Sequence, residues 1–200
     1  DIDFAVSASP EETLRLLSPF AKMIDTGLKF GTVTAVFEEV PFELTTFRAD
    51  CGIKDGRHPQ SVSFVRDIVS DLSRRDFTVN AMAWSPEKGL VDPFGGREDI
   101  AKRLIRCVGE PSLRFEEDAL RILRSLRFMS RLGFRLDDET AKALRQNAFR
   151  LKTISRERIF SELSGIICGK NACDTVTEYA DVISVALPEL FAGGAFMLKR

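Results

Sequence analysis

The sequence predicts an α+β fold in which a head of mixed strands and helices is followed by a helical region. Short β patterns and short helical patterns alternate up to about residue 90. Residues 92–96, DPFGG, form the strongest turn signal of the chain, and amphipathic helical patterns dominate after it. We therefore expect a head at residues 1–98, a helical neck at residues 99–168 and the start of a helical body at residues 169–200.

Each element expected in the head follows from a local pattern. A short helix is expected at residues 11–17, because the preceding Ser9-Pro10 is typical of a helix start. β-Rich segments predict strands at residues 32–37 and 42–48, and the short connection between them suits an antiparallel hairpin. Residues 50–59 predict a polar loop.

Beyond the head, a helix is expected at residues 115–132, because its apolar and charged side chains separate onto opposite faces. The expected apolar face contains Ala119, Ile122, Leu123, Leu126 and Met129. The expected charged face contains Glu117, Arg121, Arg124, Arg127 and Arg131. Gly133 is expected to end this helix.

Two more helices are expected near the end of the chain. Asp137 is a suitable first residue for one of them, because acidic residues follow it in the first turn. Ser155 is expected to cap the other, which ends before Gly169. The side chains that this last helix is expected to bury are Ile159, Phe160, Leu163, Ile166 and Ile167.

The composition excludes several classes of protein. A chain of 200 residues with 44% hydrophobic residues can bury a core in one or two compact units. Runs of about 20 apolar residues and a signal peptide are both missing, so we expect a cytoplasmic protein with no membrane partner. The single histidine, His58, and the spacing of the cysteines argue against a zinc site or a disulfide framework. We expect reduced, mostly buried thiols at Cys51, Cys107, Cys168 and Cys173.

The net charge of −1 is the sum over regions of opposite charge along the chain. In residues 1–50, nine acidic residues stand against four basic ones, whereas residues 114–158 hold twelve basic residues, ten of them arginine, against seven acidic ones. An acidic, cation-binding part beside an arginine-rich part suits an enzyme that handles a metal-bound nucleotide and an RNA end.

Asp1 and Asp3 are the first candidate site residues. In a strand, residues two apart project from the same face, so both carboxylates can meet one divalent cation. Mg²⁺ prefers such oxygen ligands and accepts further ones from the phosphates of a nucleotide. Taken alone, the pair is more often solvated charge, and it gains meaning only with the motifs that follow.

A third carboxylate is expected on a neighbouring strand, because phosphoryl transfer with two cations rarely uses only two carboxylates. Glu43 is the first choice, since it lies within an apolar, β-rich segment. Asp50 is the competitor, at the point where the strand gives way to the loop. The alternative for Glu43 is an outward-facing residue on an edge strand.

The segment RRDFTVN at residues 74–80 is a candidate for contacts to sugar and phosphate. In this interpretation Arg75 binds phosphate or sugar, Asp76 accepts from ribose hydroxyls, and Asn80 is oriented by the same turn. The alternative is an exposed basic pair followed by a helix-capping aspartate.

Asp118 and Arg121 form a candidate for base recognition, because residues three apart project from one helix face. A carboxylate accepts from an exocyclic amine, and a guanidinium donates to an unprotonated ring nitrogen. Cytosine and adenine match this pattern, whereas uracil and guanine present a carbonyl to the carboxylate and a ring N–H to the arginine. The alternative is an ordinary salt bridge within the helix.

These signatures, taken in order, resemble the class II CCA-adding tRNA nucleotidyltransferases and their relatives, the bacterial poly(A) polymerases. The segments that carry the resemblance are a metal motif at 1–3, a ribose motif at 74–83, a flexible joint at 92–96, a base-templating motif at 117–127 and a last neck motif at 155–165. The resemblance implies a polymerase-β-like nucleotidyltransferase head, with a mixed sheet and helices, followed by an all-α neck.

The resemblance also implies roles for single residues. Asp1 and Asp3 are implied to bind Mg²⁺, and Arg75 is implied to contact the nucleotide. Asp118 and Arg121 are implied to read the base edge, while Arg124 and Arg127 face the phosphate or RNA side. A glycine-rich segment that normally precedes the first motif, and the tail that grips tRNA, are absent from the sequence, so we expect a fragment.

The expected function is therefore template-independent addition of C, C and A to the tRNA 3′ end from CTP and ATP. The loop expected at residues 50–59 favours complete CCA addition, because the resemblance associates a mobile loop there with the switch to A. Poly(A) polymerase or an enzyme that adds only A is the alternative. An RNA-binding module without catalytic activity is a further alternative from a different class.

Overall fold

The computed structural model describes residues 3–53 and 59–190, which divide into two compact units. The first unit ends at Arg74 and the second begins at Arg75. This division comes before residues 92–96, where the sequence indicates a joint. The boundaries expected for head, neck and body stay predictions.

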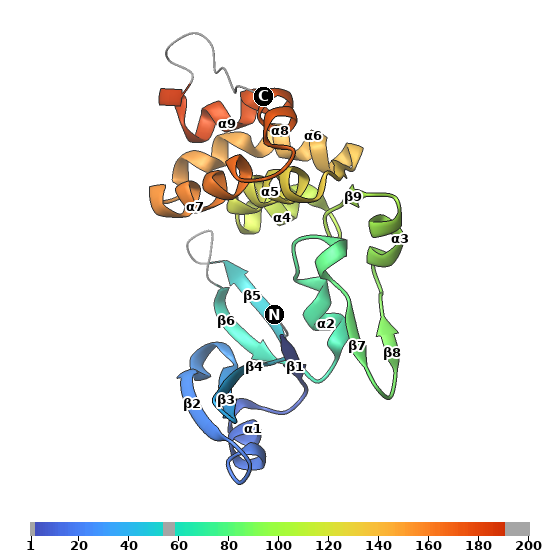
Figure 1. Cartoon of the computed structure of the whole chain (residues 1–200), viewed down its shortest axis with the longest axis vertical. Coiled ribbons are helices and arrows are strands. Elements are labelled where there is room, and N and C mark those ends of the chain that lie inside the picture. Colours follow the sequence, from blue (N-terminus) through green and yellow to red (C-terminus); the bar gives the residue numbers. More distant parts are fainter. Residues whose placement is uncertain (1–2, 54–58, 191–200) are drawn as a thin grey trace. The chain divides into compact units, whose positions relative to one another are not determined.

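The first unit combines a sheet, a hairpin and short helices (Figure 1). Its strands are β1 (Phe4–Val6), β2 (Lys22–Gly27), β3 (Thr32–Phe37), β4 (Val40–Thr46), β5 (Arg48–Ile53) and β6 (Pro59–Phe64). Its helices are α1 (Pro10–Leu17), the 3-10 helix η1 (Leu28–Phe30) and α2 (Ile68–Ser73). Within the described residues, four strands form a mixed sheet in the order β1-β4-β3-β2, in which β1 is parallel to β4 and the other pairs are antiparallel.

The two faces of this sheet differ in polarity. On one face Val33 and Ala35 are buried, and Phe4 meets Phe42 edge to face with their ring centroids 5.9 Å apart. Successive side chains of a strand alternate between the faces. Glu43, which follows Phe42 in β4, therefore projects from the opposite, polar face.

Several predictions for this unit are confirmed. α1 begins at a capping box, in which the Glu12 backbone N–H donates to Ser9 Oγ and the Ser9 backbone N–H donates to the Glu12 carboxylate. The expected hairpin joins β3 and β4, and Glu38 and Glu39 have the positive φ angles, 47° and 67°, that its tight turn requires.

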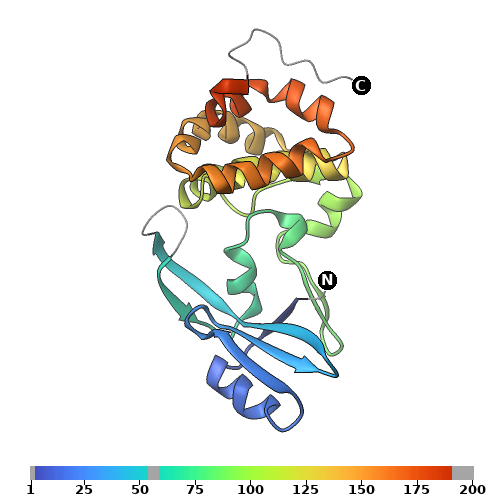
Figure 2. The same cartoon turned by 60° about the vertical axis from the view of Figure 1, so that its left-hand side comes forward.

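The loop expected at residues 50–59 is wrong for much of its length. β5 runs to Ile53 and β6 begins at Pro59, and the two strands pair in an antiparallel hairpin. This hairpin follows directly after β4 (Figure 2). Polar residues that alternate with small or apolar ones form a strand here because a partner strand satisfies their backbone groups. Residues 54–58 lie outside the described residues.

The second unit is mainly helical. It begins with η2 (Thr78–Asn80), β7 (Ala83–Ser85), β8 (Gly89–Val91), α3 (Gly96–Ala101) and β9 (Leu104–Ile105). It continues with α4 (Pro111–Glu117), α5 (Leu120–Leu132), β10 (Arg135–Leu136), α6 (Asp138–Asn147) and η3 (Ala148–Thr153). The last described elements are α7 (Arg156–Ile167), α8 (Ala172–Glu178), α9 (Ala180–Ala186) and η4 (Pro188–Leu190).

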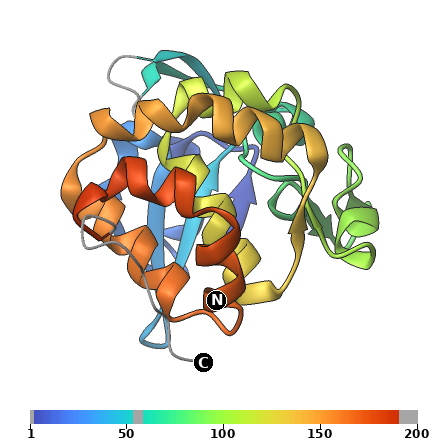
Figure 3. The same ribbon diagram turned by 90° about the horizontal axis from the view of Figure 1, so that it is seen from above.

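The core of this unit lies around α5, which packs against α7 and α8 (Figure 3). The apolar face predicted for α5 is confirmed, because its expected members are all buried. Gly133 ends α5 in the left-handed conformation with φ at 67°, as expected. Asp137 caps α6, and its side chain accepts a hydrogen bond from the Thr140 backbone N–H.

The burial predicted for α7 is partly wrong. Ile159, Leu163 and Ile166 are buried, but Phe160 is 71% exposed and Ile167 is 47% exposed. The three buried residues follow the spacing of one helical stripe, and the other two lie beside that stripe. Hydrophobicity alone does not distinguish the stripe that meets α5 from its flank.

The single helix expected at residues 115–132 is also wrong, because it is interrupted at Asp118. α4 ends at Glu117, and Asp118 has an extended backbone with φ at −150° and ψ at 106°. Its side chain accepts a hydrogen bond from the Leu120 backbone N–H at 3.0 Å. A short acidic side chain can compete in this way with the helical hydrogen bonds of the backbone.

Candidate functional site

Of the candidate carboxylates of the first unit, Asp3 directly precedes β1 and Glu43 lies in the neighbouring strand β4. In the parallel pair of β1 and β4, Phe4 lies opposite Leu44. Continued by one residue, this register places Asp3 beside Glu43, and alternation along both strands directs the two residues to the polar face. Asp3 and Glu43 are both exposed.

Glu43 differs from its expected setting in two respects, its strand position and its burial. β4 lies between β1 and β3, so Glu43 is not on an edge strand. Its side chain is exposed, so the expected burial is wrong. Asp50 lies in β5, which pairs with β6 and not with β1, so the competitor belongs to a different sheet. Asp1 lies outside the described residues.

The donor set suits a divalent cation. Two carboxylates from adjacent strands on one open face offer oxygen atoms, the ligands that Mg²⁺ prefers, and leave room for phosphate oxygens and water. Within residues 3–53 and 59–190, groups of three or more potential metal-binding side chains are not found.

In the second unit, Asp76 joins the segment RRDFTVN to α5. One carboxylate oxygen accepts from the Phe77 backbone N–H at 2.9 Å, and the other accepts from Arg124 Nε at 2.8 Å and lies 2.7 Å from its Nη2. Asp76 is 8% exposed. The pair with Arg124 fixes the carboxylate, which retains unused acceptor positions for a hydroxyl.

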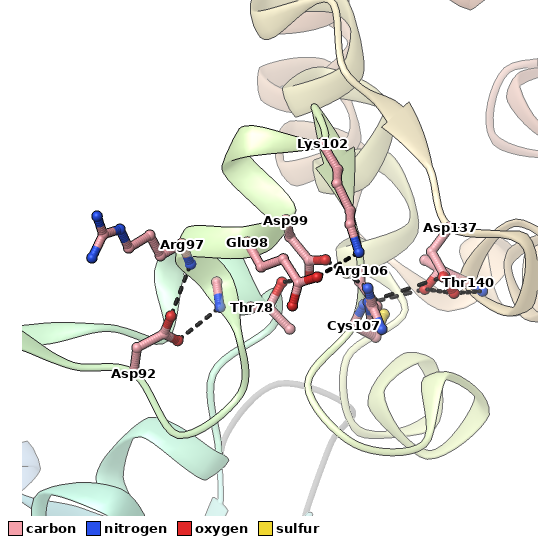
Figure 4. Close-up of polar contacts among 11 residues, drawn as sticks. Thr78, Asp92, Arg97, Glu98, Asp99, Lys102, Arg106, Cys107, Asp137 and Thr140 are labelled. Carbon is pink, nitrogen blue, oxygen red and sulfur yellow. Dashed lines mark hydrogen bonds and ion pairs between the residues drawn. The ribbon is translucent and has the colours of Figure 1, made fainter.

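A second acidic residue, Asp99, supports the same segment and is missed by the sequence analysis (Figure 4). Asp99 is 1% exposed, and its carboxylate accepts from Thr78 Oγ1 and from Arg106 Nη2, each at 2.6 Å. Gly96, one turn earlier in α3, approaches so closely that a Cβ there would lie 2.2 Å from the Thr78 carbonyl oxygen. α3 is thus anchored to the segment that contains Arg75 and Asp76.

The corner between α4 and α5 gathers the candidate base-reading residues. Glu117 pairs with Arg114 at 2.7 Å and with Arg121, which also donates to the Arg114 carbonyl oxygen at 3.1 Å. Asp118 pairs instead with Arg158 of α7 at 2.6 Å. The structure therefore brings Asp118 and Arg121 to one corner, where different charged partners hold them.

Arg127 of α5 is held against α7. Its Nε lies 2.7 Å from the Glu162 carboxylate of α7 in an ion pair that is not aligned as a hydrogen bond. Its guanidinium carbon is 5.2 Å from the ring centroid of Phe128, and a Cβ on Gly165 would lie 2.5 Å from its Cδ. The absence of a side chain at Gly165 gives Arg127 its place against α7.

The three described thiols differ in burial, and the side chain of Cys51 lies outside the described part of the structure. Cys107 is buried, and loss of hydration raises its pKa to about 12, so its thiol stays protonated at neutral pH. Cys168 is exposed, which contradicts the expected burial, and Cys173 is partly buried. Among the described residues, helices long and apolar enough to cross a membrane are not found.

The comparisons with known proteins match both units. Residues 1–106 match the family model described as the poly A polymerase head domain, and residues 133–190 match the one described as a probable RNA and SrmB-binding site of polymerase A. The CCA-adding enzyme of Geobacillus thermodenitrificans is 46% identical over 200 residues, which is 100% of this chain and 49% of that protein. The CCA-adding enzyme of Lactobacillus helveticus is 42% identical over the same shares.

Solved structures give the same result. The Bacillus stearothermophilus CCA-adding enzyme in complex with CTP superposes with a TM-score of 0.82 at 43% identity, covering 94% of this chain and 45% of that one. The Thermotoga maritima CCA-adding enzyme complexed with tRNA superposes with a TM-score of 0.74 at 28% identity, covering 94% and 44%. These similarities confirm the expected fold class. The chain spans about half the length of the relatives it matches.

We expect Asp99→Ala to destabilise the protein by about 3 kcal/mol, because it leaves a buried threonine hydroxyl and the Arg106 guanidinium without their shared acceptor. Glu98→Ala is the matched control, since Glu98 is the adjacent residue in α3 but is exposed and pairs with Lys102. Urea unfolding of both variants measures the difference. Equal midpoints for the two variants would contradict the anchoring role of Asp99.

Proposed function

Because this chain belongs to the family of CCA-adding tRNA nucleotidyltransferases and bacterial poly(A) polymerases, we propose that the protein adds C, C and A to the 3′ end of tRNA. CTP and ATP are the substrates, and the protein itself replaces a nucleic-acid template. The observation that carries this proposal is the corner of α4 and α5, where the Arg121 backbone N–H donates to the Asp118 carbonyl oxygen at 3.0 Å, so that one turn supplies a carboxylate and a guanidinium with the donor pattern for C and A.

The chemical step is assigned to the polar face of the first sheet. Asp1, Asp3 and Glu43 are the proposed catalytic carboxylates, and Asp1 and Asp3 hold Mg²⁺. When bound there, Mg²⁺ supplies activation of the attacking 3′-hydroxyl and neutralises charge on the phosphates. The register of β1 and β4 supports this assignment, because its first pair, Phe4 and Leu44, directly follows Asp3 and Glu43 along their strands.

Base selection is assigned to Asp118 and Arg121. Asp118 accepts from the exocyclic amine of cytosine or adenine, and Arg121 donates to the unprotonated ring nitrogen beside it. Uracil and guanine present a carbonyl oxygen to Asp118 and a ring N–H to Arg121. An acceptor would then face an acceptor and a donor would face a donor. Glu117, which pairs with Arg121, supports the direction of its guanidinium.

The remaining contacts are independent of base identity. Arg75 is assigned to phosphate or sugar, Asp76 to the ribose hydroxyls, and Asn80 to the turn that follows them. Arg124 and Arg127 lie on the charged side of α5, and their pairs with Asp76 and Glu162 keep them in place. These contacts position a nucleotide without selecting its base.

We expect the full-length protein to add three defined nucleotides to a tRNA that lacks its terminus. Product length on a denaturing gel, with CTP and ATP supplied singly and together, measures this. An open-ended A tract would indicate poly(A) polymerase, the second candidate, which the matched head-domain family also includes. Addition of a single A only to tRNA ending in CC would indicate an enzyme restricted to A.

We expect Asp1→Ala, Asp3→Ala and Glu43→Ala each to lower nucleotide incorporation by the full-length protein at least about a hundredfold, because the first two remove a proposed ligand of the cation and the third removes the remaining proposed catalytic carboxylate. Asp25→Ala is the control, since Asp25 is an exposed carboxylate of β2 in the same sheet. Mg²⁺-dependent CTP binding, measured by calorimetry, should weaken in the three variants. If binding and incorporation are unchanged, these carboxylates are inert and the protein is an RNA-binding module.

We expect Asp118→Ala to weaken CTP and ATP together by about 1–3 kcal/mol and to reduce discrimination against UTP and GTP, because it removes the acceptor for the exocyclic amine. Arg121→Ala should harm the same two substrates, whereas Arg75→Ala should weaken all four nucleotides almost equally. Incorporation of the four nucleotides by each variant measures this. If Asp118→Ala keeps the preference for C and A, Asp118 does not read the base and its role at the corner is structural.

A further inference from the structure

The position of Asp118 raises the question of what orients its carboxylate. Asp118 lies between two helices, where an extended backbone leaves its side chain without the support of a helical face. One oxygen, Oδ1, accepts from the Leu120 backbone N–H at 3.0 Å. A single hydrogen bond leaves the carboxylate plane free to turn about it, so a second contact is needed to define the direction of Oδ2.

Arg158 provides that second contact. Its Nη2 donates to Asp118 Oδ2 at 2.6 Å across 40 residues of sequence. Both side chains are about one-fifth exposed, at 20% for Arg158 and 19% for Asp118, so water competes with the pair only partly. The next residue in α7, Ile159, is 5% exposed, and its burial fixes the helical turn that carries Arg158.

The two contacts leave acceptor capacity on Asp118. A carboxylate offers about four lone-pair positions. Leu120 and Arg158 occupy one on each oxygen, so each oxygen keeps a position for another donor. A guanidinium has donors and no acceptor, so Oδ2 must face Arg158 as an acceptor.

We propose that Arg158 is a positioning residue that determines base selectivity, because it holds the Asp118 carboxylate in the orientation that accepts the exocyclic amine of C and A. This inference rests on the proposed function. It extends the base-reading corner to α7, so that selectivity depends on an ion pair between the α4–α5 corner and a separate helix. Arg158 does not contact the base itself in this proposal.

A merely structural role would give a different result. An ion pair that only ties α7 to the corner affects stability, and its loss would lower incorporation of all four nucleotides alike. A positioning role affects cytosine and adenine selectively, because they present an amine at N4 and N6, whereas uracil and guanine present a carbonyl there and do not use the acceptor that Arg158 orients. The ratio between nucleotides therefore separates the two roles.

The test compares full-length wild type with Arg158→Ala, Arg158→Lys and Arg156→Ala. Arg156 is the matched control, because it lies one half-turn away in α7, is 87% exposed and meets only the exposed Glu189, at 3.6 Å, among the described residues. The kcat/KM for CTP, ATP, UTP and GTP is measured on tRNA acceptors, together with the unfolding temperature.

In Arg158→Ala, we expect kcat/KM to fall about tenfold or more for CTP and ATP and to change much less for UTP and GTP. Arg158→Lys should recover part of the selectivity, since it keeps the charge but loses the planar fork. Arg156→Ala should match wild type. Should Arg158→Ala prove too unstable to assay, Arg158→Gln, which keeps a donor without the charge, is judged by the same ratio.

An equal loss for all four nucleotides, or an unchanged ratio, would overturn the role of Arg158 while leaving the proposed function intact. Failure of the proposed function is seen in wild type alone, as equal use of the four nucleotides or no incorporation, and then this inference falls with it. The wild-type result therefore distinguishes the two failures.

Discussion

The burial of one face of α5 is the constraint on which the second unit depends. Ile122, Leu123 and Leu126 are fully buried in the core shared with α7 and α8. A helix whose apolar face is fixed in this way has no freedom to rotate about its axis. The arginines on the opposite face therefore point in defined directions. The hydrophobic core thus determines where their guanidinium groups lie.

Acidic residues from other segments hold arginines of α5 and α7. Arg124 pairs with Asp76 and Arg127 with Glu162, while Arg158 reaches Asp118 from α7. Such pairs add little net stability, because each charge loses hydration when the pair forms. Their effect is geometric: they limit the directions of long side chains and so prepare a surface that can distinguish donors from acceptors.

The prediction of the fold succeeded where a local signal was sufficient. The start of α1 at Ser9-Pro10, the hairpin between β3 and β4 and the C-terminal stop at Gly133 depend on neighbouring residues and were found. The helix break at Asp118 was missed, because the apolar period continues across it and the break depends on one side-chain hydrogen bond. The pairing of Asp50 in β5 was missed because the polar residues of this segment predict a loop, although their backbone pairs with β6.

The sequence by itself determined the residue types of the site, the order of its motifs and the apolar face of α5, since these depend on composition and spacing. Only the tertiary structure decided that Glu43 is exposed on an internal strand beside Asp3, that Asp99 anchors Thr78, and that Arg158 meets Asp118. The physical reason is that an ion pair between residues 40 positions apart has no local signature. It exists only because the packing of the core places α7 beside the α4–α5 corner.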